Sequence, residues 1–210
     1  MPRPPRLLLP QSYYHVMTRG NNRHVVFRTE GDYLYYLHLV RKYKIDHPFD
    51  LYHYCLMPNH THFLVKTNKA SDFSNFMKRL NLAYFHHYRS GYGWVGHFWQ
   101  DRFKSQPVGK DSYFIQCGKY IELNPVRSGL VAQPENHSFS SFQYYFNGKL
   151  DSLVTRDFFY DEMGKTEKEK QKAYRDLVID SSIVANYLRP VWGSRYQQHQ
   201  ESKKVRYHLG

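Results

Sequence analysis

Two histidines that flank a single residue, His60 and His62, follow a tight turn at Pro58-Asn59. The segments on either side of this turn, residues 50–57 and 60–66, are rich in aromatic and β-branched side chains, which predicts two strands joined by a hairpin. Side chains at positions i and i+2 of a strand point to the same face of a sheet. The two imidazoles can therefore present their nitrogens to one metal ion.

A phenol and an amide occur farther along the chain, at Tyr120 and Asn124. The apolar spacing of residues 111–123 predicts a helix, and side chains four residues apart lie on the same helix face. Pro125 predicts the end of this helix, because the residue before a proline is biased away from helical geometry. A phenol that can act as a nucleophile beside two metal ligands indicates an enzyme that cleaves DNA with a tyrosine.

Two other interpretations of the histidine pair remain open at this point. The chain has 13 histidines, so a pair of this spacing arises readily by chance and can be purely structural. A zinc site could instead combine the pair with Cys55. That geometry is awkward, because Cys55 precedes His60 across the predicted turn.

The charge of the chain indicates a polyanionic partner. The net charge is +12, and residues 1–130 hold 18 Lys and Arg against 8 Asp and Glu, whereas the remainder holds 12 against 10. The excess lies on the part that carries the candidate site, as expected for nucleic-acid binding. Aromatic and basic residues alternate in residues 84–89 and 98–104, which suits stacking on unpaired bases and so favours single strands or hairpin tips.

Composition also argues against several classes of protein. No apolar run approaches the length needed to cross a membrane, and the first ten residues lack the apolar core and cleavage site of a signal peptide. Only Cys55 and Cys117 are present, both in predicted core elements, so a disulfide framework is not expected. We therefore expect a cytoplasmic, nucleoid-associated protein with no membrane partner.

The order of the predicted elements indicates an α+β fold. Strands are predicted at residues 12–18, 50–57, 60–66 and 104–108, with helices beginning near residue 29 and residue 71. This β-α-β-β-α-β order is typical of a ferredoxin-like antiparallel sheet with helices on one face, which leaves the other face open. Residues 1–148 are expected to form this domain. Residues 149–210 are expected to form a helical C-terminal extension, with helices at 158–163, 168–178 and 182–188 and a mobile basic end at 197–210.

Three segments carry a resemblance to a known family: residues 18–23 (TRGNNR), 57–62 (MPNHTH) and 120–129 (YIELNPVRSG). They strongly resemble the REP-associated tyrosine transposases of bacteria, domesticated relatives of the single-tyrosine, His-hydrophobe-His insertion-sequence transposases. Residues 99–103 and 134–141 are also similar to this family. The resemblance covers residues 12–148 well and the remainder loosely.

The resemblance implies roles for individual residues. Tyr120 matches the catalytic nucleophile, and His60, His62 and Asn124 match the ligands of a divalent ion, which their mixed nitrogen and oxygen donors suggest to be Mg²⁺ or Mn²⁺. The residue between the histidines is usually bulky and apolar in the family, whereas here it is Thr61. Because Thr61 points to the other face of the strand, we expect no loss of activity.

The resemblance also implies a reaction and a partner. The expected activity is metal-dependent nicking and strand transfer on palindromic, hairpin-forming single-stranded DNA through a 5′-phosphotyrosine intermediate, by a monomer or homodimer. A catalytically idle protein that binds single-stranded nucleic acid on the same fold is the alternative. The candidate DNA-binding residues are Arg19, Asn21, Asn22, Arg23, Trp99, Gln100, Arg102 and Lys104.

Overall fold

A computed structural model describes residues 8–110 and 112–179 of the chain. The elements that build the sheet and its covering helices are β1 (Tyr13–Arg19), α1 (Glu30–Asp46), β2 (Phe49–Met57), β3 (His60–Thr67), α2 (Ala70–Tyr92) and β4 (Lys104–Val108). They are followed by α3 (Ser112–Glu122), α4 (Asn124–Arg127), α5 (Phe142–Asn147), α6 (Phe158–Glu162) and α7 (Glu167–Ile179), with short 3₁₀ turns at Asn21–Arg23 and Pro134–Asn136.

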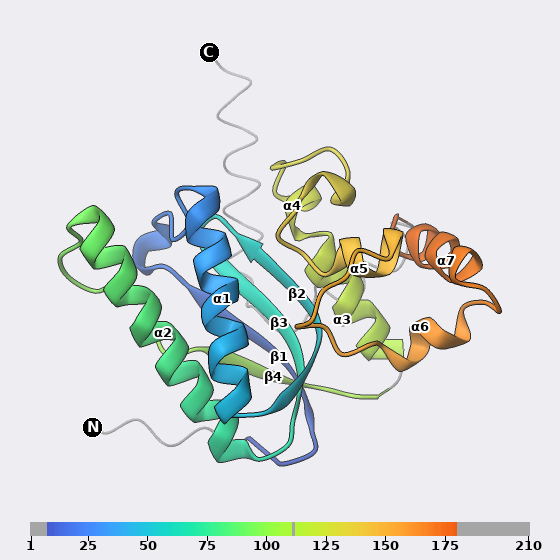
Figure 1. Ribbon diagram of the computed structural model, residues 1–210, viewed down its shortest axis with the longest axis horizontal. Coiled ribbons are helices and arrows are strands. Elements are labelled where there is room, and N and C mark those ends of the chain that lie inside the picture. The colour runs from blue at the N-terminus through green and yellow to red at the C-terminus, as the bar shows by residue number, and fades with distance from the viewer. Residues whose placement is uncertain (1–7, 111, 180–210) are drawn as a thin grey trace, which may run out of the picture.

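The four strands form one antiparallel sheet in the order β2-β3-β1-β4. Helices α1 and α2 lie side by side across one face of this sheet (Figure 1). Their buried side chains, such as Tyr36 and Leu80, pack in one core with Val16, Phe63 and Val65 of the central strands. The expected α+β class and ferredoxin-like arrangement are therefore confirmed, including the two crossover helices on the same face.

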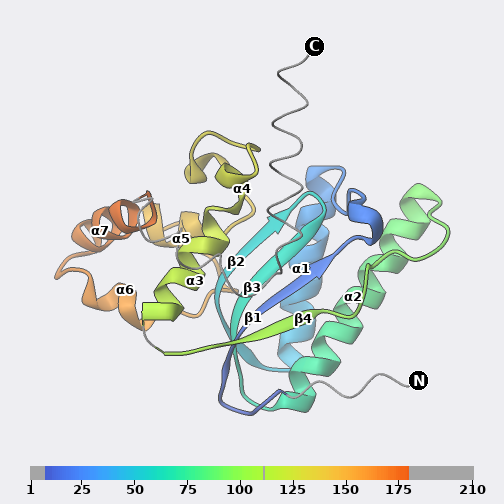
Figure 2. The same cartoon turned by 180° about the vertical axis from the view of Figure 1, so that it is seen from behind.

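The opposite face of the sheet is not open over its whole width, contrary to expectation. Helix α3 packs against β2 and β3 there (Figure 2), and Phe114, Cys117 and Ile121 form a second buried cluster with residues such as Cys55 and Leu64 of the strands. The physical reason lies in β2, whose residues 51–57 are all buried. A strand that is buried on both faces needs cover on both faces.

The expected end of the helix before Pro125 is confirmed, because α3 ends at Glu122, but an unexpected short helix follows at once. Leu123 keeps helical backbone angles, and α4 begins at Asn124 with Pro125 in its first turn. The first amides of a helix have no partner within it, so the missing N–H of a proline costs nothing there. The chain therefore turns from α3 into α4 without passing through an extended loop.

The described part of the C-terminal extension packs on the core. Tyr160, Tyr174 and Val178 of α6 and α7 form a third buried cluster with Phe142 and Leu123. The expected helix at 182–188 and the basic end at 197–210 lie outside the described residues. Both cysteines are free and buried, and within 8–110 and 112–179 no helix is long and apolar enough to cross a membrane.

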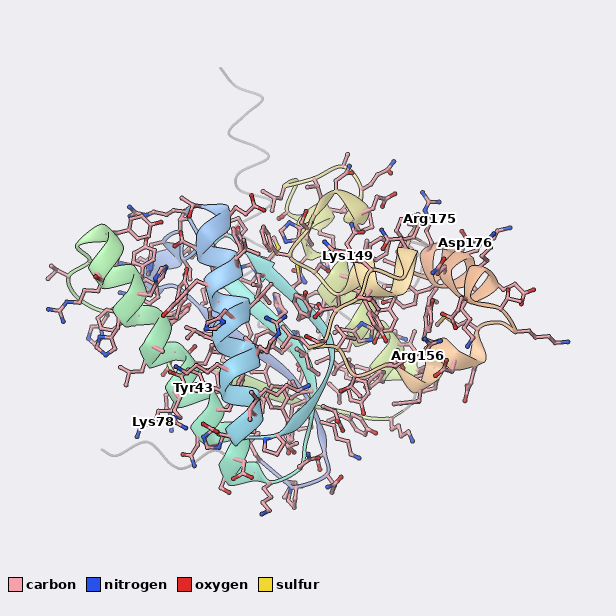
Figure 3. The ribbon with its side chains drawn as sticks, viewed as in Figure 1. Tyr43, Lys78, Lys149, Arg156, Arg175 and Asp176 are labelled. Carbon is pink, nitrogen blue, oxygen red and sulfur yellow. The ribbon has the colours of Figure 1, made fainter. Side chains whose placement is uncertain are left out.

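The outer surface of the extension carries charges of both signs. Figure 3 shows Arg156, Arg175 and Asp176 on its helices and the preceding loop, away from the sheet. Arg156 forms ion pairs with Asp161 and Glu167 at 2.7 Å each. These cations are largely matched by carboxylates, in line with the nearly balanced charge of residues 131–210.

Candidate active site

The pairing of β1 with β3 assembles the polar face of the sheet. In this antiparallel register, Arg19 lies opposite His60 and Met17 lies opposite His62. Because alternate residues share a face, His15, Met17 and Arg19 of β1 lie on the same face as the two histidines. Thr61 is buried on the other face, as predicted from its position between them.

The structure adds a third histidine to the predicted pair. His15 is fully buried, and its Nε2 lies 2.9 Å from Nδ1 of His62. The ring centroids of His60 and His62 are 4.8 Å apart, and those of His15 and His62 are 5.1 Å apart. Sequence reasoning missed His15, although its alternation with Met17 on the first predicted strand was the signal that could have revealed it.

All three imidazoles are held in their neutral form. Burial lowers the pKa of His15 to about 4. Burial, followed by the charges of Arg19 and His15, lowers the pKa of His60 to about 3. The same causes, burial first and then the neighbouring imidazoles, hold the pKa of His62 well below its usual range. Neutral imidazoles have the free lone pairs that metal binding requires.

Tyr120 of α3 faces this histidine cluster. Its ring lies edge-on to His15 at a centroid distance of 5.7 Å and edge-on to His62 at 5.9 Å. The guanidinium carbon of Arg127 lies over the same ring, 5.1 Å from its centroid. A cation in this position stabilises negative charge that develops on the phenol oxygen. The structure thus brings the predicted tyrosine and the predicted histidine pair together.

Asn124 lies one turn after Tyr120, at the start of α4. Its Nδ2 donates to the backbone oxygen of Tyr120 at 2.8 Å and to that of Ile121 at 3.3 Å. These bonds fix the amide in place and leave its Oδ1 as the atom that could serve as a ligand. Leu123 keeps helical backbone angles between α3 and α4, and these bonds join the Asn124 amide directly to the backbone of Tyr120. That the two side chains share one helix face stays a prediction.

The donor set fits a divalent ion. Nε2 of His62 is buried and has no hydrogen-bond partner. An unsatisfied buried polar atom destabilises the folded protein unless a bound ligand satisfies it. The two imidazoles and the amide oxygen of Asn124 would hold the ion. Across the described ranges, no three His, Cys, Asp or Glu side chains are arranged to hold a metal, which gives the zinc alternative with Cys55 no support.

The loop after β1, residues 20–27, lies against the turn that precedes His60. The backbone N–H of Gly20 donates to the carbonyl of Asn59 at 2.9 Å, and Asn59 Nδ2 donates to the carbonyl of Arg23 at 3.3 Å. Asn22 and Arg23 have φ of 48° and 59°, in the left-handed region that side chains rarely adopt. Such conformations persist where the surrounding structure holds them, as the bonds to the turn do here.

Four of the eight candidate DNA-binding residues line one small cavity beside the histidines. Arg19, Gln100, Arg102 and Lys104 surround a volume of about 140 Å³ with Met17 and Asp101. Asn21, Asn22 and Arg23 lie on the neighbouring loop instead. This loop is joined to the 98–100 segment, because the backbone N–H of Asn21 donates to the carbonyl of Phe98 at 2.8 Å.

Trp99 is partly buried and fixed in place. Its Nε1 donates to the carbonyl of Asn81 at 2.9 Å, and its ring lies against Phe98 at a centroid distance of 4.7 Å. The rest of the ring lines a larger groove of about 900 Å³ between α2 and residues 96–103. Gln100 and Arg102 line both the groove and the small cavity, so the two are contiguous.

Comparisons with known proteins agree with this geometry. The chain is similar to a REP-associated tyrosine transposase of Escherichia coli (strain K12), with 25% identity over 132 residues that cover 62% of this chain and 76% of the relative. Its fold is similar to a solved structure of a REP-associated tyrosine transposase bound to a REP hairpin, with a TM-score of 0.60 and 22% identity, over 75% of this chain and 93% of that one.

A family model described as "Transposase IS200 like" matches residues 9–124, a range that includes β1, the histidine pair, Tyr120 and Asn124. The match covers more than half of the 210 residues. It confirms the resemblance seen in the sequence motifs. The chain belongs to the IS200-like transposases, a family of DNA-cleaving enzymes.

Proposed function

We propose that the protein is a metal-dependent nickase and strand transferase that acts on hairpin-forming single-stranded DNA. The observation that supports this most directly is the position of Tyr120, edge-on to both His15 and His62 within 6 Å of each ring centroid. A nucleophile and a metal-binding pair must meet at one phosphate for this chemistry. Family membership supports DNA cleavage in general, and the hairpin complex of the structural relative supports a hairpin as the substrate.

The proposed reaction is an in-line displacement at phosphorus. The phenol oxygen of Tyr120 forms a bond to phosphorus while the bond from phosphorus to the 3′ oxygen breaks. The phenol gives up its proton and the departing 3′ oxygen takes one up, so that a 5′-phosphotyrosine and a free 3′-hydroxyl result. The covalent link retains the energy of the phosphodiester, so that a second 3′-hydroxyl can be joined by the reverse step without ATP.

The residues around Tyr120 would each contribute to this step. His60, His62 and Asn124 would hold a Mg²⁺ or Mn²⁺ ion, which when bound polarises the scissile phosphate and stabilises its developing charge. Arg127, whose guanidinium lies over the Tyr120 ring, favours negative charge on the attacking oxygen.

The cavity and the groove give the DNA strand a path to the site. Arg19, Arg102 and Lys104 would contact phosphates beside His60, and the apolar wall of the groove would receive unpaired bases. The strained loop at Asn22 and Arg23 would contact the hairpin. The extension, in which Arg156, Lys170 and Arg175 are paired with carboxylates, would add little to phosphate attraction.

A covalent-adduct assay tests this function. Radiolabelled hairpin DNA with single-stranded flanks is incubated with the protein and Mn²⁺ or Mg²⁺, and with EDTA as the control. We expect a labelled protein band that survives denaturing electrophoresis only in the presence of the metal. Tight hairpin binding without any adduct would instead establish the catalytically idle alternative.

A further inference from the structure

A buried polar network joins α3, the helix of Tyr120, to the C-terminal extension. Its centre is the carboxylate of Glu122, which is completely buried. Oε1 of Glu122 accepts from Ser141 Oγ at 2.6 Å and lies 3.0 Å from His53 Nδ1. Oε2 accepts from the hydroxyl of Tyr174 in α7 at 2.5 Å. Three elements remote in sequence therefore converge on one side chain of α3.

The network continues through His53 into α6. His53 Nε2 lies 3.3 Å from Oδ2 of Asp157, whose other oxygen caps the helix by accepting from the backbone N–H of Phe159 at 2.8 Å. The ring of His53 fits against α3 only because residue 118 is glycine, since a Cβ there would come within 2.8 Å of His53 Nε2. The contact thus depends on residues from β2, α3 and α6 together.

Glu122 and Tyr120 lie on different sides of the same helix. Two residues correspond to about 200° around an α-helix, so the network holds α3 on the side away from the histidine cluster. Side chains extend about 5–6 Å from a helix axis, so a rotation of about 10° moves their ends by about 1 Å. Misplacement of a reacting group by that distance can slow a reaction on the order of 100-fold.

An apolar interface would join the extension to α3 without the desolvation cost of a buried carboxylate. A buried carboxylate is tolerated only when its oxygens are satisfied, and here that requires donors in fixed positions on separate elements. Such directional contacts specify one rotation of a helix, which interchangeable apolar contacts specify less well.

We propose that Tyr174 and Glu122 are positioning residues, through which α7 fixes the rotation of α3 and places the Tyr120 hydroxyl for attack. This inference rests on the proposed function of Tyr120. It assigns the extension a part in the reaction through the geometry of the nucleophile, separate from DNA binding.

The test compares Tyr174→Phe with Tyr160→Phe. Tyr160 is a matched control, because its buried hydroxyl also donates one hydrogen bond from the extension to the core domain, to the backbone oxygen of Tyr145 in α5 at 3.1 Å. We expect Tyr174→Phe to slow single-turnover adduct formation at saturating hairpin DNA by about tenfold or more. Hairpin affinity should stay within about twofold of that of the unmodified protein. Tyr160→Phe should form the adduct at a rate within about twofold of that of the unmodified protein. We expect this even if Tyr160→Phe lowers the thermal unfolding midpoint as much as Tyr174→Phe does.

A second measurement does not depend on activity. With 3-fluorotyrosine at position 120, the ¹⁹F resonance reports the position of that ring against His15 and His62. We expect Tyr174→Phe to shift or split the resonance and Tyr160→Phe to leave it unchanged. Ser141→Ala, which removes another donor to Glu122, should act like Tyr174→Phe and serves as the second variant if Tyr174→Phe folds poorly.

The two failures are distinguishable. An unmodified protein that forms no adduct would refute the proposed function, while the ¹⁹F measurement would still decide whether α7 positions the ring. An unchanged resonance in Tyr174→Phe, a full adduct rate in that variant, or an equal loss of rate in Tyr160→Phe would overturn the positioning role.

Discussion

Nε2 of His15 lies 2.9 Å from Nδ1 of His62, and both rings are buried. Because Nδ1 of His62 is engaged with His15, Nε2 is the atom of His62 that remains for a ligand, and it has no partner. Metal-binding histidines commonly bond through their second ring nitrogen to a fixed partner, which sets the orientation of the ring. His15 therefore has the position of a supporting residue for the candidate metal site.

Replacing His15 by leucine should weaken metal binding. Loss of a supporting partner typically lowers metal affinity by about 10- to 100-fold, and we expect this range for Mn²⁺ measured by isothermal titration calorimetry. His15→Gln can restore the hydrogen bond to His62 and should lose less. Hairpin affinity without metal serves as the control and should not change. An unaltered Mn²⁺ affinity in His15→Leu would show that His15 has no such role.

His60→Ala and His62→Ala should each lose metal-dependent cleavage while the protein stays folded. Each substitution removes one of the two imidazoles that share a face of β3. Circular dichroism checks the fold, and calorimetry of the double variant checks the metal. If the double variant bound Mn²⁺ as well as the unmodified protein, the metal site would lie elsewhere in the chain.

The stability of the protein should fall between about pH 6.5 and pH 9 because of His53. Burial alone would lower the pKa of His53, but its contacts with Asp157 and Glu122 outweigh burial and raise the pKa to about 9. The protonated imidazole stabilises the folded state fully below the unfolded pKa of about 6.5, and this contribution is lost as the pH rises through about 9. This contribution to the free energy of unfolding is on the order of 3 kcal/mol.

Thermal unfolding at a series of pH values measures this effect. We expect the midpoint of the unmodified protein to fall as the pH rises from 6.5 to 9.5, and the midpoint of His53→Gln to be lower at pH 6.5 and flatter across the range. Parallel curves for the two proteins would mean that His53 is not the group responsible.

Arg102→Ala should weaken hairpin binding in a salt-dependent manner. Arg102 lines both the small cavity and the groove, and each lost phosphate contact lowers the slope of log K against log salt by about 1. Lys149→Ala is the matched control, since Lys149 is exposed on the loop that begins the extension (Figure 3). Fluorescence anisotropy from 50 to 200 mM salt compares the two. An equal effect of both substitutions would point to general electrostatic attraction in place of a defined binding path.

The local features of the site could be predicted from sequence because they depend on neighbouring residues. The alternation in β3 and the turn at Pro58-Asn59 placed His60 and His62 on one face, and β4 falls at residues 104–108 as expected. His15 was missed because its role depends on the pairing of β1 with β3. That pairing follows from the ferredoxin-like strand order, which the predicted elements already indicated.

Contacts between remote segments could not be predicted in the same way. The network around Glu122 joins residues as far apart as His53 and Tyr174, and nothing in local spacing indicates that they meet. The packing of α3 on the second face of the sheet likewise depends on tertiary burial of β2. The short helix α4 was not predicted, because a proline that is unfavourable inside a helix is well accommodated in the first turn of the next one.

The most direct test of the central claim identifies the tyrosine that carries the DNA. The protein is incubated with hairpin DNA and Mn²⁺, digested with protease and nuclease, and the nucleotide-linked peptide is sequenced by mass spectrometry. We predict linkage at Tyr120, no adduct in Tyr120→Phe, and normal adduct in Tyr113→Phe, the control on the same helix. Hairpin affinity should be nearly unchanged in Tyr120→Phe, because the basic surface is untouched. Linkage at another tyrosine, or an undiminished adduct in Tyr120→Phe, would contradict the proposed mechanism.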